Sequence, residues 1–136
     1  MKILMGFYNA EKYIQRSILS VMSQNFKDYK CYITSDNSTD NSVELVNQII
    51  KNDKRFQLVE DTDIKLYQTG NFDRNIRDNK EIDDDEVLVE VDGDDFLPDV
   101  NVLDRINSVY KDPNIWIANG SFQYANGSPG FNATGT

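Results

Sequence analysis

Apolar residues recur along the chain in short runs that alternate with segments of helical spacing. Four runs have the β-prone, buried character of strands. They span residues 2–7, 29–35, 56–60 and 86–91. Three other segments carry apolar side chains every three or four residues, which is typical of helices with one buried face. They span residues 11–24, 43–52 and 98–109. This alternation predicts an α/β domain with a mainly parallel sheet and helices on both faces.

The remaining segments have weaker patterns. Residues 61–80 are polar and weakly periodic, which predicts a loop with one helix near residues 71–79. Residues 114–119, with the sequence NIWIAN, predict a last strand. From residue 120 to residue 136 the chain is rich in Gly, Asn, Ser and Thr, so we expect a loop or a frayed tail.

Cap chemistry marks the beginnings of the predicted helices. Asn9 precedes the first helix and is suited to cap it. Asp40 or Asn41 can cap the second helix, with Glu44 nearby as a partner. Pro98 can start the last helix, because proline is favoured in a first helical turn.

Charge and residue usage narrow the chemistry. The net charge is −9, and nine of the 23 acidic residues lie between Glu81 and Asp95, where there is no base. No basic stripe exists to neutralise phosphates, so a nucleic-acid partner is not expected; a local excess of carboxylates suggests a cation. The chain has no histidine and a single cysteine, Cys31, which excludes His-dependent catalysis and Cys-based zinc sites.

Length and hydropathy predict one domain outside the membrane. The 136 residues fit a single domain, and no run approaches the roughly 18 apolar residues that cross a bilayer. The short apolar run at the start gives way to polar residues, so we expect no cleaved signal peptide. A cytoplasmic protein is the resulting prediction.

Polar clusters follow three of the predicted strands. Tyr8 and Asn9 follow the first, residues 35–40 (SDNSTD) follow the second, and residues 92–95 (DGDD) follow the fourth. Because the carboxyl ends of parallel strands meet at one edge of a sheet, these clusters are expected to form one pocket. Asp36 stands at the end of its strand, where its carboxylate can face an N–H group of a ligand.

The DGDD cluster has two interpretations. Asp92 and Asp94, separated by Gly93, can point toward one hard cation such as Mg²⁺ or Mn²⁺, which prefers one or two carboxylates together with the phosphates of a nucleotide. The alternative is an acidic turn that caps the next helix through Asp95 or Asp99. The cluster alone does not decide between them.

Two motifs in order resemble a known family. The segment ILMGFYNAEKYIQRSILSVMSQNFKDYKCYITSDNSTDNSVELV is similar to the opening of family 2 glycosyltransferases of the Rossmann-like GT-A fold, with a Ser-Val-x-x-Gln helix end and an Asp-Asn-Ser turn. The later segment VEVDGDDFLPD resembles the Asp-x-Asp motif of the same family. The resemblance covers residues 3–117.

The resemblance implies roles for the pocket residues. Phe7 and Tyr8 would line the base pocket, with Tyr8 stacking on a uracil, and Asn9 would belong to the same nucleotide-binding turn. Asp36 would accept a hydrogen bond from the base N3–H.

The acidic motif carries the implied metal chemistry. Asp94 would bind the Mn²⁺ or Mg²⁺ that bridges the diphosphate, while Asp92 would reach the ribose or a metal-bound water, with Asp95 supporting these ligands. Arg74 and Asn75 match an Arg-Asn pair of the family, in which the arginine could meet a phosphate, although this chain departs from the family pattern at Arg77, where glycine is usual.

The implied reaction is an inverting transfer of a sugar from a UDP-sugar to an acceptor hydroxyl. Residues 1–118 would bind the nucleotide sugar, and residues 119–136 would begin an acceptor region. No residue is identified as the catalytic base, so the chain is expected to be a fragment of a longer enzyme, a minimal protein completed elsewhere, or a binding module without transferase activity. The acceptor is not indicated, and a homo-oligomer stays open. A phosphotransfer receiver is disfavoured, because it needs acids where Phe7, Tyr8 and Asn9 stand.

Overall fold

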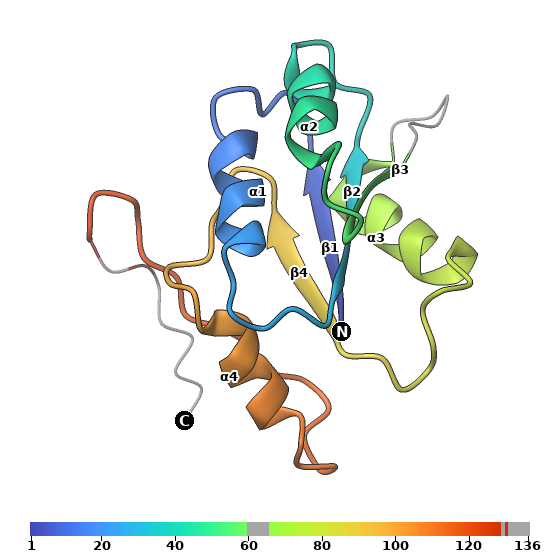
Figure 1. Ribbon diagram of the computed structural model, residues 1–136, viewed down its shortest axis with the longest axis vertical. Coiled ribbons are helices and arrows are strands. Elements are labelled where there is room, and N and C mark those ends of the chain that lie inside the picture. Colours follow the sequence, from blue (N-terminus) through green and yellow to red (C-terminus); the bar gives the residue numbers. More distant parts are fainter. Residues whose placement is uncertain (60–65, 129, 131–136) are drawn as a thin grey trace.

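The computed structural model describes residues 1–59, 66–128 and 130, and its described strands form one parallel sheet (Figure 1). The sheet order is β3-β2-β1-β4. The strands are β1 (Lys2–Phe7), β2 (Lys30–Ser35), β3 (Phe56–Val59) and β4 (Leu88–Asp92). The four predicted strands and their parallel pairing are confirmed to within two residues at their ends, apart from Glu60, which lies outside the described residues.

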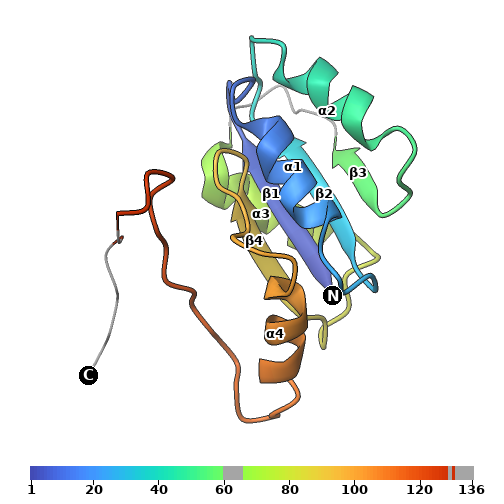
Figure 2. The ribbon, with the colours of Figure 1, turned by 60° about the vertical axis from the view of Figure 1, so that its left-hand side comes forward.

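Helices cover both faces of the sheet, as predicted. They are α1 (Ile14–Met22), α2 (Ser42–Ile50), α3 (Tyr67–Asp78) and α4 (Val102–Val109). Figure 2 shows α1 in front of the sheet and α3 behind it. In the described residues, no helix is long and apolar enough to span a bilayer.

The main core lies between the sheet and α1, α2 and α4. The apolar positions of α1 that set its predicted spacing, Ile14, Ile18 and Val21, are fully buried. They join residues of alternating position on the strands, such as Ile3 and Ile33, in one cluster. Burial of a large aliphatic side chain contributes about 1.5–3 kcal/mol. The core therefore fixes the sheet and, with it, the edge where the strands end.

The other face of the sheet is covered by α3. The prediction of a helix near residues 71–79 is confirmed, and the helix begins earlier, at Tyr67. Residues 61–65, the first part of the predicted loop, lie outside the described residues. A buried polar contact joins the layers, because the Asn75 side chain donates to Thr34 Oγ1 at 2.7 Å.

The predicted strand at residues 114–119 is wrong. These residues form no strand in the structure, and Trp116 and Ile117 are 86% and 80% exposed. An apolar, β-prone run becomes a strand only where another strand accepts its backbone hydrogen bonds. Of the predicted tail, residues 120–128 and 130 are described and lie outside helices and strands.

Two predicted helix starts are also wrong. Asn9 does not cap α1, whose N-cap position is held by Tyr13. Pro98 lies in a bend before α4, which begins at Val102 after the N-cap residue Asn101. Both residues instead belong to connecting loops, where residue preferences overlap with those of caps.

Candidate functional site

The ends of β2 and β4 are held on either side of the end of β1. In the ladders, Phe7 is paired with Ser35 and Gly6 with Asp92. The pairing continues past the strands, because the Asp36 N–H donates to the Phe7 carbonyl at 2.9 Å and the Gly93 N–H donates to the Gly6 carbonyl at 2.8 Å. The three polar clusters of the sequence therefore meet at one edge, as expected.

A pocket of about 390 Å³ opens at this edge. It is lined by the turns that follow β1, β2 and β4, together with the beginning of α3. The lining residues are Gly6, Phe7, Tyr8, Asn9, Ala10, Tyr13, Asp36, Tyr67, Asn71, Asp92, Gly93 and Asp94. Six of the seven predicted site residues are among them, and Arg74 is not.

The turn after β1 presents one aromatic ring and buries another. Tyr8 is 50% exposed, whereas Phe7 is 6% exposed and belongs to the core cluster. Asn9 adopts a φ of 48°, in the left-handed region that asparagine tolerates better than most residues. Its Oδ1 accepts the Thr39 N–H at 2.8 Å. Tyr8 is therefore the exposed aromatic group of this turn.

The turn after β2 is fastened to the turn after β1. The Ala10 N–H donates to Ser42 Oγ at 2.8 Å, and the Glu11 N–H donates to Asp40 Oδ2 at 3.1 Å. Burial would raise the pKa of Asp40, but hydrogen bonds from Ser42 and Glu11 outweigh it and lower that pKa below its usual value. Asp40 also accepts the Ser42 N–H, while Asn41 occupies the N-cap position of α2 with no side-chain cap bond. Of the two predicted cap residues, Asn41 therefore holds the N-cap position, while Asp40 supplies a side-chain hydrogen bond to the first residue of α2.

Asp36 has a structural role that the sequence did not indicate. Its carboxylate is 8% exposed and lies at the beginning of α3. Oδ1 accepts the Leu66 N–H at 2.9 Å and Nδ2 of Asn71 at 3.0 Å, and the Tyr67 N–H lies 3.2 Å from each oxygen. A carboxylate at a helix N-terminus satisfies free N–H groups and complements the helix dipole. Asp36 therefore anchors α3 to the sheet edge while lining the pocket.

Asp36→Asn is expected to lower the free energy of unfolding by about 1–3 kcal/mol, because one carboxylate oxygen becomes an NH₂ group that cannot accept these hydrogen bonds. Urea unfolding followed by circular dichroism measures the change. Asp73→Asn is the matched control, since Asp73 is an exposed residue of α3 whose ion pair with Arg77 lies on the surface and is worth little. If Asp36→Asn is as stable as the wild type, the Asp36 carboxylate does not anchor α3.

Two acids, Asp92 at the end of β4 and Asp94 in the turn after it, lie beside the pocket. The Asp95 N–H donates to the Asp92 carbonyl at 3.0 Å, which closes the turn around Gly93. Asp92 is half-buried and Asp94 is exposed, and both line the pocket. Within the described chain, no hydrogen bond or ion pair engages the Asp94 carboxylate.

The capping interpretation of the DGDD cluster named Asp95 or Asp99, and the structure gives the contacts at the start of α4 to Asp99. Asp99 accepts the Asn101 N–H at 2.8 Å and pairs with Arg105 at 2.8 Å, at the start of α4. The hydrogen bond from Arg105 lowers the pKa of Asp99. Helix-start chemistry is thus supplied beyond the cluster, which leaves Asp92 and Asp94 beside the pocket.

The donor set of the pocket fits a metal shared with a ligand. No group of three or more His, Cys, Asp or Glu side chains that could hold a metal ion occurs among residues 1–59, 66–128 and 130. Two carboxylates together with phosphate oxygens are a usual environment for Mg²⁺. The residues present are consistent with a cation whose remaining ligands come from a bound molecule.

The two residues of the predicted Arg74–Asn75 pair have different surroundings in the structure. Asn75 is buried and donates to Thr34 Oγ1 and to the Asn71 carbonyl, so it joins α3 to β2. Arg74 does not line the pocket, and its contact with a phosphate stays a prediction.

Three aromatic or polar residues of the pocket, Tyr13, Tyr67 and Asn71, are not indicated by the sequence pattern. Tyr67 and Asn71 lie one helical turn apart on α3, whose weak periodicity did not show which face meets the sheet. Tyr13 precedes α1 and was interpreted as part of that helix. Knowing which face of α3 packs on the sheet would have indicated Tyr67 and Asn71, since residues four apart share a helix face.

Comparison with known proteins identifies the family. The protein-family model described as "Glycosyl transferase family 2" matches residues 2–133. The chain belongs to this family.

Curated relatives of this glycosyltransferase family are similar over part of the chain. An uncharacterized glycosyltransferase of Haemophilus influenzae is 43% identical over 56 residues, which are 41% of this chain and 22% of that protein. The chondroitin synthase of Pasteurella multocida is 36% identical over 52 residues, which are 38% of this chain and 5% of that protein. The matched region is thus about a fifth or less of the length of these relatives.

Solved structures show the same fold, the α/β GT-A type. S. aureus TarS 1–349 in complex with UDP-GlcNAc superimposes with a TM-score of 0.69 at 19% identity, covering 82% of this chain and 31% of that one. The mannosyltransferase PcManGT from Pyrobaculum calidifontis, in complex with GDP-Man and Mn²⁺, gives a TM-score of 0.71 at 16% identity, covering 84% and 33%. At these identities the likeness concerns the fold.

Proposed function

We propose that the chain binds the donor substrate of a family 2 glycosyltransferase, a UDP-sugar, together with Mn²⁺ or Mg²⁺. The observation that carries the proposal is the convergence of Tyr8, Asp36, Asp92 and Asp94 on one pocket from three separate loops. An aromatic ring, a hydrogen-bond acceptor and a pair of carboxylates match the base, ribose and metal-bound diphosphate of such a donor.

Each group has one task in this proposal. Tyr8 stacks on the uracil ring, and Asp36 accepts the base N3–H with the lone pairs that α3 leaves free. Asp94 binds the metal and Asp92 the ribose or a metal-bound water. When bound, the metal would neutralise charge on the diphosphate as the sugar leaves. Phe7 supports the base pocket from the core side, and its contact with the base is correspondingly small.

The structural neighbours support a nucleotide-sugar donor, and the TarS structures favour uridine as its base. Structures of S. aureus TarS 1–349 contain UDP-GlcNAc or UDP, and the structure of PcManGT contains GDP-Man and Mn²⁺. We assign donor binding to residues 1–118 and infer an inverting transfer to an acceptor hydroxyl for the whole protein. The alternative, a nucleotide-sugar-binding module without transferase activity, has the same pocket and differs only in turnover.

Isothermal titration of the chain with UDP, with and without Mn²⁺, tests the proposal. We expect UDP to bind at least about tenfold more tightly when Mn²⁺ is present, because two carboxylates and a diphosphate share the cation. GDP in a parallel titration checks the choice of base. Failure of UDP to bind in the presence of Mn²⁺ would overturn the proposal, and hydrolysis of a UDP-sugar by the chain would exclude the inactive module.

A further inference from the structure

Two polar side chains of α1, Ser17 and Ser20, and the side chain of Gln24, just past the C-cap of α1, contact the loop that carries the acidic motif. We call residues 92–99, which begin at the last residue of β4, the acidic loop. Ser17 and Ser20 are three residues apart and share one face of α1, and Gln24 follows four residues after Ser20. Ser17 and Gln24 are fully buried. All three side chains bond to the backbone of the acidic loop.

Ser17 lies beneath Asp94. Its Oγ lies 2.8 Å from the carbonyl oxygen of Gly93 and also contacts the carbonyl oxygen of Asp95, the two residues that flank Asp94. A hydroxyl group has one proton to donate, which these two carbonyls share with the more distant Tyr13 carbonyl at 3.4 Å. Because both flanking carbonyls face α1, the peptide units around Asp94 are fixed from the core side, while Asp94 itself is exposed and lines the pocket.

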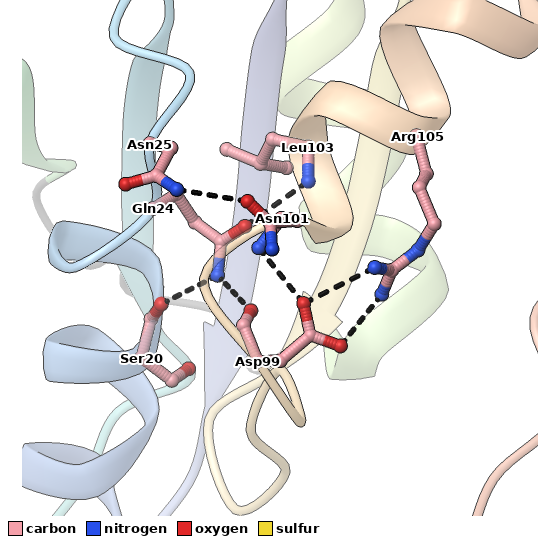
Figure 3. Close-up of polar contacts among 7 residues, drawn as sticks. All are labelled: Ser20, Gln24, Asn25, Asp99, Asn101, Leu103 and Arg105. Carbon is pink, nitrogen blue, oxygen red and sulfur yellow. Dashed lines mark hydrogen bonds and ion pairs between the residues drawn. The ribbon is translucent and has the colours of Figure 1, made fainter.

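The rest of the acidic loop is fixed by the other two side chains. The Leu97 N–H donates to Ser20 Oγ at 3.0 Å. Figure 3 shows the Gln24 amide between α1 and α4. Its Nε2 donates to the Asp99 carbonyl at 2.6 Å and to the Ser20 carbonyl at 3.0 Å, and its Oε1 accepts the Leu103 N–H at 3.0 Å. The loop is therefore held along its length by a helix that belongs to the core.

A hydroxyl at position 17 is not required by the packing of α1. The neighbouring positions Ile14, Ile18 and Val21 are apolar and fully buried. Alanine would occupy a similar volume and is a better helix former, by a few tenths of a kcal/mol. What alanine cannot supply is the contact with the two carbonyls that flank Asp94.

We propose that Ser17 is a positioning residue that holds Asp94 in the geometry required to bind the donor's metal ion. The inference rests on the proposed function, because it assigns to Ser17 the orientation of a metal ligand in that pocket. Groups that orient metal ligands typically contribute 10- to 100-fold to metal affinity.

Ser17→Ala tests the proposal with two measurements. The first is amide hydrogen exchange of residues 93–97 without ligand, which we expect to become at least about tenfold faster once the hydrogen bond from Ser17 is lost. The second is UDP affinity with and without Mn²⁺. We expect the gain from Mn²⁺ to fall by about tenfold. UDP affinity without metal should change by less than about twofold, since Ser17 does not line the pocket.

Two further variants make the result specific. Ser23→Ala removes a hydroxyl at the C-terminal end of α1 whose one hydrogen bond within the described residues is to the Ser20 carbonyl, so neither measurement should change. Ser20→Ala should speed exchange at Leu97 while leaving the gain from Mn²⁺ within about twofold, because its bond lies beyond Asp94.

The possible outcomes separate this inference from the proposed function. Unchanged exchange at residues 93–97 in Ser17→Ala, or an equal loss of UDP affinity with and without Mn²⁺, would show a merely structural serine and overturn the inference. If the wild type shows no gain from Mn²⁺, the metal assignment of the pocket fails, and the positioning role of Ser17 fails with it even where exchange accelerates.

Discussion

Asp94→Ala is expected to remove at least about tenfold of the gain in UDP affinity that Mn²⁺ provides, while UDP affinity without metal changes by less than about twofold. Asp94 is the exposed acid of the turn after β4, it lines the pocket, and its carboxylate accepts no hydrogen bond within the described chain. A carboxylate that accepts no hydrogen bond from the described residues is suited to bind a cation. Titration calorimetry with UDP, with and without Mn²⁺, measures both affinities.

Asp95→Ala is the control for that experiment. Asp95 is the next acid in the same turn and is also exposed; the family resemblance implies that it supports the metal ligands, but its side chain does not line the pocket, so we expect a smaller effect than at Asp94. Its replacement changes the local charge by the same amount, so a general electrostatic effect would appear equally in both variants. An identical response of Asp94→Ala and Asp95→Ala would contradict a specific ligand at Asp94.

The strand ends made the candidate site predictable. A parallel sheet needs only the order of strands and loops to bring polar clusters to one edge, and Tyr8, Asp36 and Asp92 lie at or just after the ends of three different strands. Apolar periodicity fixed the strands and α1, because burial of one face dominates the energetics of such elements. Fold and pocket location thus follow from short-range patterns.

The roles of individual polar residues were harder to predict, because they depend on contacts between distant segments. Asp36 bonds to the beginning of α3, 30 residues further along the chain, which no local pattern reveals. Asn9 and Asn75 were assigned to a cap or a binding motif, but their amides join separate elements of the fold. Short polar side chains satisfy caps, turns and tertiary contacts equally well, so the sequence alone does not separate these roles.

The prediction of a strand at residues 114–119 is wrong for a related reason. Its composition is that of a strand, yet Trp116 is almost fully exposed. The propensity of a strand reflects packing against its neighbours more than an intrinsic backbone preference. A prediction from composition alone therefore cannot tell whether another strand lies alongside, and that decides whether the segment forms a strand.

Gly93→Ala is expected to destabilise the fold by about 1–3 kcal/mol, the usual cost of overpacking a core. A Cβ atom at Gly93 would lie 2.5 Å from Cβ of Phe7, 3.0 Å from the Gly6 carbonyl oxygen and 3.1 Å from Cδ1 of Ile14. Two of these atoms belong to β1 or are attached directly to its backbone, so relief requires a shift between β1 and β4. The glycine of the acidic motif is therefore needed for close packing of the two strands that form the pocket floor.

Gly6→Ala is the matched control, because Gly6 lies beside Gly93 at the same sheet edge and a Cβ atom there meets nothing within 4 Å. Replacing a strand glycine where space allows reduces the entropy of the unfolded chain, so Gly6→Ala should keep or raise stability by about 0.4–1 kcal/mol. Urea unfolding of both variants gives the comparison. Equal stability of the two would mean that β4 can move away from β1 at little cost, and the spacing of Asp92 and Asp94 around Gly93 would then need no glycine.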